Sequence, residues 1–159
     1  MNPFYRVDNR LVHGQIISTW IQHLRLKSFV VANDALPLND LQMTMFRMAI
    51  PEEISFRALS IEDAAVWLNE NKSTMASTMV LLASLDDALR LFNSGHPFPR
   101  LNLGNIHHAP GRTAITNAVY LGDKDIKCLQ DLARRGVRSE VKSLPSESPH
   151  DLKSVIGAC

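Results

Sequence analysis

Cysteine is scarce in this sequence, which has two thiols, Cys128 and Cys159, among 159 residues. Two thiols cannot form a disulfide framework, and neither lies in a Cys/His spacing typical of a zinc site. We therefore expect a reducing, cytoplasmic setting and no bound metal.

Long hydrophobic runs and an excess of charge are also missing. No apolar run approaches the roughly 18 residues that cross a bilayer, and the first residues, MNPFYRVDNR, lack a signal-peptide core. The 17 Lys and Arg against 16 Asp and Glu are interleaved along the chain. We expect no nucleic-acid partner, and if the chain acts in transport, another protein must supply the membrane part.

Glycine-rich phosphate loops are absent as well. The seven glycines form neither a Walker loop nor a dinucleotide fingerprint. Neither ATP nor NAD is therefore expected, and no other cofactor is indicated.

Short apolar runs that alternate with helical patterns dominate what is present. Repeated strand-then-helix order predicts an α/β fold: a single domain over residues 1–159 with an open, doubly wound, mainly parallel sheet and helices on both faces. The expected strands are PFYRV, SFVVAN, residues 54–57, TMVLLA, RLNLGN, NAVYL and, as the edge strand before a polar tail, VRSEV; the expected helices cover residues 14–24, 41–49, 60–68, 84–92 and 123–135.

The helical pattern over residues 41–49 places Leu41, Met45, Met48 and Ala49 on one face, which we expect to pack into the core. The six methionines are interpreted as core filler. Trp20 is expected in the core, with a rim position that touches a partner as the alternative. His23, His96 and His150 are expected in loops or on the surface.

Parallel α/β sheets bind ligands outside the carboxyl ends of their strands. This rule places residues 8–13, 33–34 and 105–108, with Ser84, along one rim. Asp34, Ser84, His107 and His108 are therefore candidate rim residues. Each also has a local interpretation: a turn for Asp34, a helix cap for Ser84 and a solvated turn for the two histidines, and the local one is favoured for the last three.

The stretch RVDNRLVHGQI, residues 6–16, has the side chains that a phosphohistidine needs. His13 can supply a neutral imidazole near pH 7, and Arg6 and Arg10 are suited to phosphate oxygens. Backbone amides from Gly14 and Gln15 can add donors at a helix start, and Asp8 can orient the ring or an arginine. A histidine at such a junction can equally be a cap or a packed residue.

RVDNRLVHGQI closely resembles the signature of the enzyme IIB component of the mannose/fructose/sorbose family of the bacterial sugar phosphotransferase system. VVANDAL, MAIP, LNLGNIHH, DKDIKCLQDLARRGV and SLP follow in the same order as in that family. The resemblance covers essentially the whole chain. Asn9 departs from it, because the family often has a second aspartate there.

The resemblance implies that His13 accepts a phosphoryl group from a phosphohistidine IIA protein, supplied as a separate chain, and passes it to a sugar held by a IIC/IID permease. It implies catalytic roles for His13 and Asp8, with Asp8 orienting the ring or an arginine, phosphate binding by Arg6 and Arg10, and peripheral association with the permease. A regulatory phosphoacceptor and a noncatalytic anion-binding module are the alternatives, and a homodimer is left open.

Overall fold

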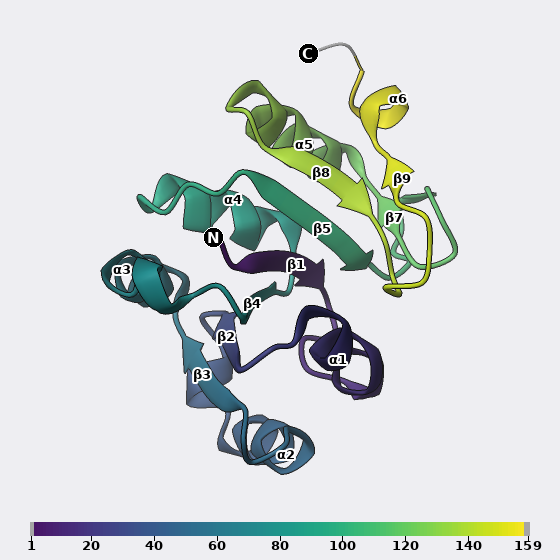
Figure 1. The fold of residues 1–159 in the computed structure, drawn as a ribbon. Helices are drawn as coiled ribbons and strands as arrows, with labels where there is room; N and C mark the ends of the chain where they lie inside the picture. Colours follow the sequence, from purple (N-terminus) through teal and green to yellow (C-terminus); the bar gives the residue numbers. More distant parts are fainter. Residues whose placement is uncertain (1, 158–159) are drawn as a thin grey trace.

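The computed structural model describes residues 2–157, and its central feature is one seven-stranded sheet in the order β3-β2-β4-β1-β5-β8-β9 (Figure 1). All pairs from β3 to β8 are parallel, β9 is antiparallel to β8, and β6 and β7 form a separate antiparallel pair. The strands are β1 (Phe4–Asp8), β2 (Ser28–Ala32), β3 (Ser55–Leu59), β4 (Thr78–Leu82), β5 (Arg100–Asn105), β6 (Thr113–Ala114), β7 (Tyr120–Leu121), β8 (Arg138–Val141) and β9 (His150–Asp151).

Helices cover both faces of the sheet and enclose two apolar clusters, as the predicted doubly wound α/β fold requires (Figure 1). One cluster lies under α3, α4 and α5, and the other under η1, α1 and α2. None of the helices among residues 2–157 is both long and apolar enough to cross a membrane. The helices are η1 (Ile16–Trp20, π-helical), α1 (Ile21–Leu24), η2 (Leu36–Leu38), α2 (Asp40–Ala49), α3 (Ile61–Glu70), η3 (Lys72–Thr74), α4 (Leu85–Asn93), α5 (Asp123–Arg134) and α6 (Lys153–Ile156).

Local sequence signals explain where several elements begin. Every residue of the apolar run in β4 is buried, as expected for a central strand covered on both sides. Ser60 and Ser84 cap α3 and α4, accepting hydrogen bonds at 3.1 Å from the amides of Asp63 and Asp87. These caps set the positions at which the chain leaves the carboxyl edge of the sheet.

Helix α2 packs on a different face from the one that its apolar periodicity predicts. Phe46 points into the core, whereas Leu41, Met45 and Met48 are 73, 59 and 81 % exposed. The prediction that these three side chains pack inside was therefore wrong, and so was the view of Met45 and Met48 as core filler. The helix is apolar on two sides, and periodicity alone does not tell which side meets the sheet.

The carboxyl-terminal segment has more structure than its polar composition predicts. The chain after β8 makes a turn and returns as β9, so β8 is an inner strand rather than the expected edge. Leu152 and Ile156 are buried against the main core. Two apolar anchors in a polar segment are too few to give a periodic signal.

His96 lies in the loop before β5, which was one of its two expected positions, but it is buried, so the alternative of a surface position is wrong. The Asn69 amide nitrogen donates to the carbonyl of Gly95, so its oxygen is free to accept from His96 Nδ1 at 2.8 Å. His96 Nε2 then lacks a proton and accepts from the Tyr5 hydroxyl at 2.6 Å. The network holds a neutral imidazole, and burial, aided by the charge of Lys72, lowers the pKa of His96 to about 4.

This buried imidazole predicts a loss of stability in mild acid. An unfolded histidine titrates near pH 6.5, so between about pH 6.5 and about pH 4 the unfolded chain binds a proton that folded His96 does not. We expect the free energy of unfolding to fall across that window by up to about 3 kcal/mol, measured by urea unfolding at several pH values. His96→Gln should flatten this slope, whereas substitution of the exposed His23 by glutamine should leave it unchanged.

Candidate functional site

The candidate site is built where β1 ends and the chain turns into the first helix. Pairing between β1 and β5 is interrupted by a bulge, because Val7 lies opposite Leu103 and Asp8 opposite Asn105. The Leu11 amide donates to the carbonyl of Asp8 at 2.9 Å, which closes a turn. Leu11 itself has a φ of 59° and is buried, so packing holds it in the left-handed region. This turn brings the chain back over Asp8.

Asp8 is the centre of the site. Its side chain is fully buried, and Oδ2 lies 2.9 Å from Nε2 of His13, whose side chain is 14 % exposed. Oδ1 accepts from the backbone amide of Arg10 at 3.1 Å. The fold therefore brings Asp8 and His13, the two residues with expected catalytic roles, into contact, and His13 is the more exposed of the two.

Arg10 makes a bidentate contact with the Asp8 carboxylate from the more exposed side. Its Nε donates to Asp8 Oδ1 and its Nη2 to Oδ2, both at 3.0 Å. The side chain is 37 % exposed, and its Nη1 makes no hydrogen bond to any of the described residues. Arg10 can therefore hold Asp8 and still present N–H groups to an anion.

The proton on His13 follows from the charge of its partner. Burial on its own raises the pKa of Asp8, but hydrogen bonds from His13 and Arg10, together with the charges of His13 and Arg6, hold it well below its ordinary value. An ionised carboxylate can only accept hydrogen bonds. Nε2 of His13 must therefore carry the proton, and in the neutral ring the lone pair lies on Nδ1.

Arg6 does not reach the surface, which differs from the phosphate contact expected for it. The side chain is completely buried, and its Nη2 donates to Asp8 Oδ2 at 3.2 Å and to the carbonyl of Ser143 at 3.1 Å. Its Nη1 donates to Asn102 Oδ1 at 2.8 Å and to the carbonyl of Lys142 at 3.1 Å. All four Nη hydrogens are thus used inside the protein, and the geometry favours a role in holding Asp8.

A flat slot receives the Arg6 guanidinium. On one side lies the Trp20 ring, whose centroid is 4.9 Å from Arg6 Cζ and whose Nε1 donates to the carbonyl of Ser143 at 3.0 Å. On the other side lies Gly104, where a Cβ atom would be only 2.0 Å from Arg6 Cζ. The bulged strand can approach the guanidinium this closely only because residue 104 has no side chain.

Backbone donors complete the solvent side of the site. The Ile17 amide donates to the His13 carbonyl at 3.2 Å, so the helix begins directly after His13. The amides of Gly14 and Gln15 are then in the first turn, where no intrahelical acceptor exists. Both residues are exposed. Arg10 and Gln15 also form part of the wall of an open cleft of about 400 Å³, which continues over Asn117, Glu147, Ser148 and His150.

The candidate rim residues have local partners of their own. Asp34 Oδ2 pairs with Arg90 at 2.8 Å and its Oδ1 accepts from the Ile61 amide at 3.0 Å. The Ile61 amide, followed by Arg90, lowers the pKa of Asp34.

Ser84, His107 and His108 make no hydrogen bond to Asp8 or to its partners Arg6, Arg10 and His13. Ser84 is the cap of α4. His107 and His108 are exposed, His108 lying edge-on to Tyr120 with ring centroids 5.4 Å apart. Of the rim stretch 105–108, only Asn105, the last residue of β5, bonds to the turn that follows β1, through Asn9.

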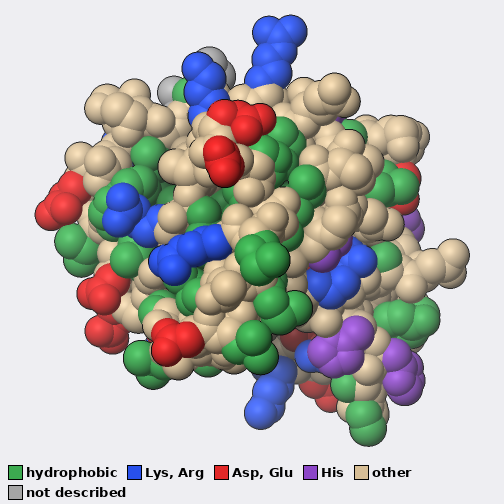
Figure 2. Space-filling view, turned by 90° about the horizontal axis from the view of Figure 1, so that it is seen from below, with side chains coloured by type: hydrophobic (Ala, Val, Ile, Leu, Met, Phe, Trp, Pro, Cys, Tyr) green, Lys and Arg blue, Asp and Glu red, His purple; other side chains and the backbone are tan. Residues whose placement is uncertain are grey.

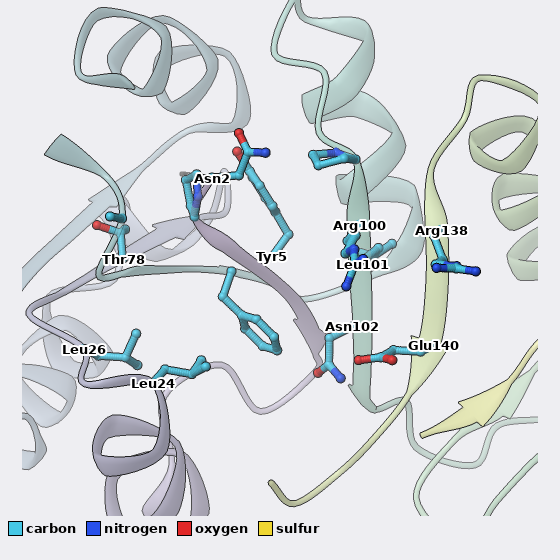
Figure 3. Close-up of a pocket in the computed structure, with 14 residues that line it drawn as sticks. Asn2, Tyr5, Leu24, Leu26, Thr78, Arg100, Leu101, Asn102, Arg138 and Glu140 are labelled. Atoms are coloured by element: carbon cyan, nitrogen blue, oxygen red, sulfur yellow. The ribbon is translucent and has the colours of Figure 1, made fainter. Parts of the chain in front are cut away.

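A hollow of about 350 Å³ lies away from this group, between the end of α1 and the β5–β8 face (Figure 3). Figure 3 shows Leu24 and Leu26 on one side and Arg100, Arg138 and Glu140 on the other. Asp8, Arg10 and His13 do not line it. Among residues 2–157, no group of three or more His, Cys, Asp or Glu side chains is placed to hold a metal.

Sequence reasoning missed Asn102, Gly104, Trp20 and the carbonyls of residues 142 and 143 as parts of the site. A weak signal for two of them was present: Asn102 and Gly104 alternate in RLNLGN, so a polar and a minimal side chain share one face of a buried strand. The carbonyls have no sequence signal, since any residue supplies one.

The fold and this edge of the sheet define an α/β protein with a partly exposed histidine that is held by a buried carboxylate and lies close to an arginine and backbone amides with unused N–H groups. The family described as the PTS system sorbose subfamily IIB component matches residues 3–158. The chain belongs to this family, a phosphotransferase component of sugar transport, and the resemblance seen in the sequence is confirmed.

Relatives of this chain share the fold over nearly its whole length. The N-acetylgalactosamine-specific phosphotransferase enzyme IIB component 2 of Escherichia coli is 30 % identical over 148 residues, covering 92 % of this chain and 93 % of the relative. The crystal structure of an N-acetyl-galactosamine-IIB component from Streptococcus pyogenes has a TM-score of 0.90 at 30 % identity, covering 97 % of each chain. The mannose-specific EIIAB component of Escherichia coli is 25 % identical over 142 residues, which are 89 % of this chain and 44 % of that relative.

Proposed function

We propose that the protein carries a phosphoryl group on Nδ1 of His13, between a phosphohistidine IIA protein and a sugar. The observation that carries this proposal is the 2.9 Å contact of His13 Nε2 with the ionised, buried Asp8. It assigns the proton to Nε2 and leaves the lone pair of the neutral ring on Nδ1. Asp8 also supplies a fixed negative charge next to Nε2, on the side of the ring away from Nδ1.

Phosphoryl uptake then needs only positioning and charge stabilisation. The Nδ1 lone pair attacks phosphorus in line, the Nδ1–P bond forms, and the N–P bond of the donor histidine breaks and returns its electron pair to that histidine. As Nδ1 shares its lone pair, the His13 ring becomes positively charged, and Asp8 stabilises that charge. The free Nη1 of Arg10 and the amides of Gly14 and Gln15 are the donors for the phosphoryl oxygens.

Transfer onward runs in the opposite sense. A sugar hydroxyl oxygen attacks phosphorus, the Nδ1–P bond breaks, and the hydroxyl proton leaves to Nδ1 or to water. The positive ring is a good leaving group because it departs as a neutral imidazole. The exposure of His13 and the cleft beside Arg10 and Gln15 leave the site open to a docking partner.

The partners follow from the family. An EIIAB relative carries its IIA and IIB units under one name, which supports a IIA protein as donor for this chain. The acceptor is a sugar bound in a IIC/IID permease, and we place the protein in the cytoplasm, at the permease during transfer. A regulatory phosphoacceptor would use the same His13 chemistry without a sugar.

The test is phosphoryl uptake from phosphoenolpyruvate through a general phosphotransferase cascade, with phosphohistidine preserved at alkaline pH during mass spectrometry. The native chain is expected to gain one label on His13, assigned to Nδ1 by nuclear magnetic resonance of the imidazole nitrogens. His13→Ala should take up none, whereas His23→Ala, a change at an exposed histidine, should take up label at the native rate.

Labelling of the His13→Ala chain would overturn the proposal, and label on Nε2 would overturn its account of the ring. Adding IIC/IID vesicles and sugar separates the two uses of the phosphohistidine. Loss of label that depends on both the vesicles and the sugar supports the carrier, and label that persists supports the regulatory phosphoacceptor.

A further inference from the structure

Four of the five large hydrophobic side chains that are exposed among the described residues lie on η2 and α2. We call Leu38, Leu41, Met45 and Met48 the α2 stripe; they are 86, 73, 59 and 81 % exposed. Figure 2, seen from the side where α2 lies in Figure 1, shows hydrophobic side chains at this surface. Apolar patches of several hundred Å² on a protein surface usually mark an interaction site.

The α2 stripe has the spacing of a helix-pairing seam. Leu41, Met45 and Met48 lie on α2 and are four and three residues apart, which is the alternation of positions that meet a second helix in a coiled coil. Leu38 lies in η2, just before the non-helical Asn39, and extends the patch beyond the start of α2. The core face of α2, around Phe46, is a different face, so the fold does not use the stripe. One apolar face of α2 packs on the sheet, and the described residues supply no packing partner for the other.

The charges around the stripe favour a second copy of the chain as the other neighbour. The side chains beside the seam, at Gln42, Thr44 and Ala49, are uncharged. Asp40 and Arg47 are exposed, make no ion pair with any described residue, and cancel each other. A lipid surface or a nucleic acid would call for a basic border. The same neutral patch can meet itself without repulsion.

We propose that the α2 stripe joins two copies of this chain, with the two α2 helices antiparallel about a twofold axis near Thr44 and Met45. In this arrangement Leu41 packs against Met48 of the partner subunit. The dipoles of the two helices oppose each other, and the end of α2 that carries Asp40 lies toward the end that carries Arg47 in the other copy.

The area available suits a reversible dimer. Four side chains exposed to this degree present roughly 600 Å² per copy, and covering most of it buries on the order of 1,000 Å² in the pair, the lower limit for a specific interface. No member of the stripe takes part in the hydrogen-bond group around Asp8. Dimerisation therefore leaves the chemistry at His13 unchanged.

Sedimentation velocity of the full chain over about 1–100 µM tests the proposal. The native chain should shift from monomer to dimer as concentration rises, and Met45→Asp should stay monomeric at about 100 µM. Val66→Asp is the matched control, because Val66 on α3 is also exposed, at 57 %, but lies outside the stripe. At about 1 µM, where the native chain is expected to be monomeric, all three should show the same urea unfolding midpoint, since both substituted side chains are exposed.

Cross-linking tests the orientation of the helices. In a background with both native cysteines replaced by serine, Thr44→Cys should oxidise to a covalent dimer, because Thr44 lies next to the twofold axis in the antiparallel pair only. Glu62→Cys, on the exposed face of α3, should not. A native chain that is monomeric throughout, a dimer that survives Met45→Asp, or no cross-link at Thr44→Cys would overturn the proposal.

Discussion

Asp8→Asn is expected to lower the free energy of unfolding by about 3 kcal/mol or more and the rate of phosphoryl uptake at least about 100-fold. The carboxylate is fully buried and accepts hydrogen bonds from Arg6, Arg10 and His13. An asparagine of the same shape removes the negative charge and leaves the buried guanidinium of Arg6 without compensation. Its oxygen can serve only part of the donor set, and its amide hydrogens face other donors.

The loss of uptake has a separate cause from the loss of stability. An ionised carboxylate stabilises the His13 tautomer that is protonated on Nε2, and the neutral asparagine side chain does not. In the other tautomer, Nδ1 carries the proton and has no lone pair for attack on phosphorus. Urea unfolding and initial rates of uptake at saturating donor measure the two effects. Asp34→Asn is the control, because this exposed carboxylate also pairs with an arginine, and it should cost under about 1 kcal/mol and leave uptake unchanged.

Unchanged uptake by a folded Asp8→Asn chain would show that Asp8 does not set the proton on His13. The pH dependence adds a second readout. Because its folded pKa is depressed, Asp8 contributes stability that is present above about pH 4, the ordinary value for aspartate, and is lost as the pH falls toward its lower folded value. This window lies below the one expected for His96, so the two groups can be distinguished in the same titration of stability.

The sequence was sufficient for those parts of the protein that depend on local pattern. Apolar runs and helix caps such as Ser60 and Ser84 predicted the parallel sheet and its two layers, and the strand-end rule put Asp8 and His13 at one edge. Those signals are local, because a cap such as Ser60 to Asp63 spans four residues and each buried strand spans five or six.

The features that local pattern did not predict depend on contacts between distant residues. Arg6 was expected to bind phosphate because an arginine in a motif has the right chemistry, yet β5 and the chain after β8 enclose it. Leu41, Met45 and Met48 were expected inside because periodicity identifies a face without saying what covers it. His96 was correctly expected in a loop, but its burial had no local signal because its partners, Tyr5 and Asn69, are 91 and 27 residues away in the chain.

Gly104→Ala is expected to disturb the site from behind, lowering the free energy of unfolding by about 2–4 kcal/mol and uptake by about tenfold. The new methyl group would lie 2.0 Å from Cζ and 2.1 Å from Nη2 of Arg6, and Trp20 blocks the opposite side. The guanidinium must therefore leave its slot and give up its bond to Asp8. Uptake suffers less than in Asp8→Asn because the bonds of Arg10 and His13 to the carboxylate survive.

A double-mutant cycle shows whether Gly104 acts through Arg6 or through the strand itself. Gly104 has no positive φ, so the backbone tolerates alanine and the cost comes from space alone. In an Arg6→Met background, which leaves no guanidinium to displace, Gly104→Ala should cost less than about 1 kcal/mol and leave the remaining uptake unchanged. Gly122→Ala, where a Cβ atom meets nothing closer than 3.4 Å, should be nearly neutral in both backgrounds. An undiminished cost in the Arg6→Met background would mean that the bulge needs glycine for its own geometry, and that Arg6 is held by Asn102 and the carbonyls of residues 142 and 143 alone.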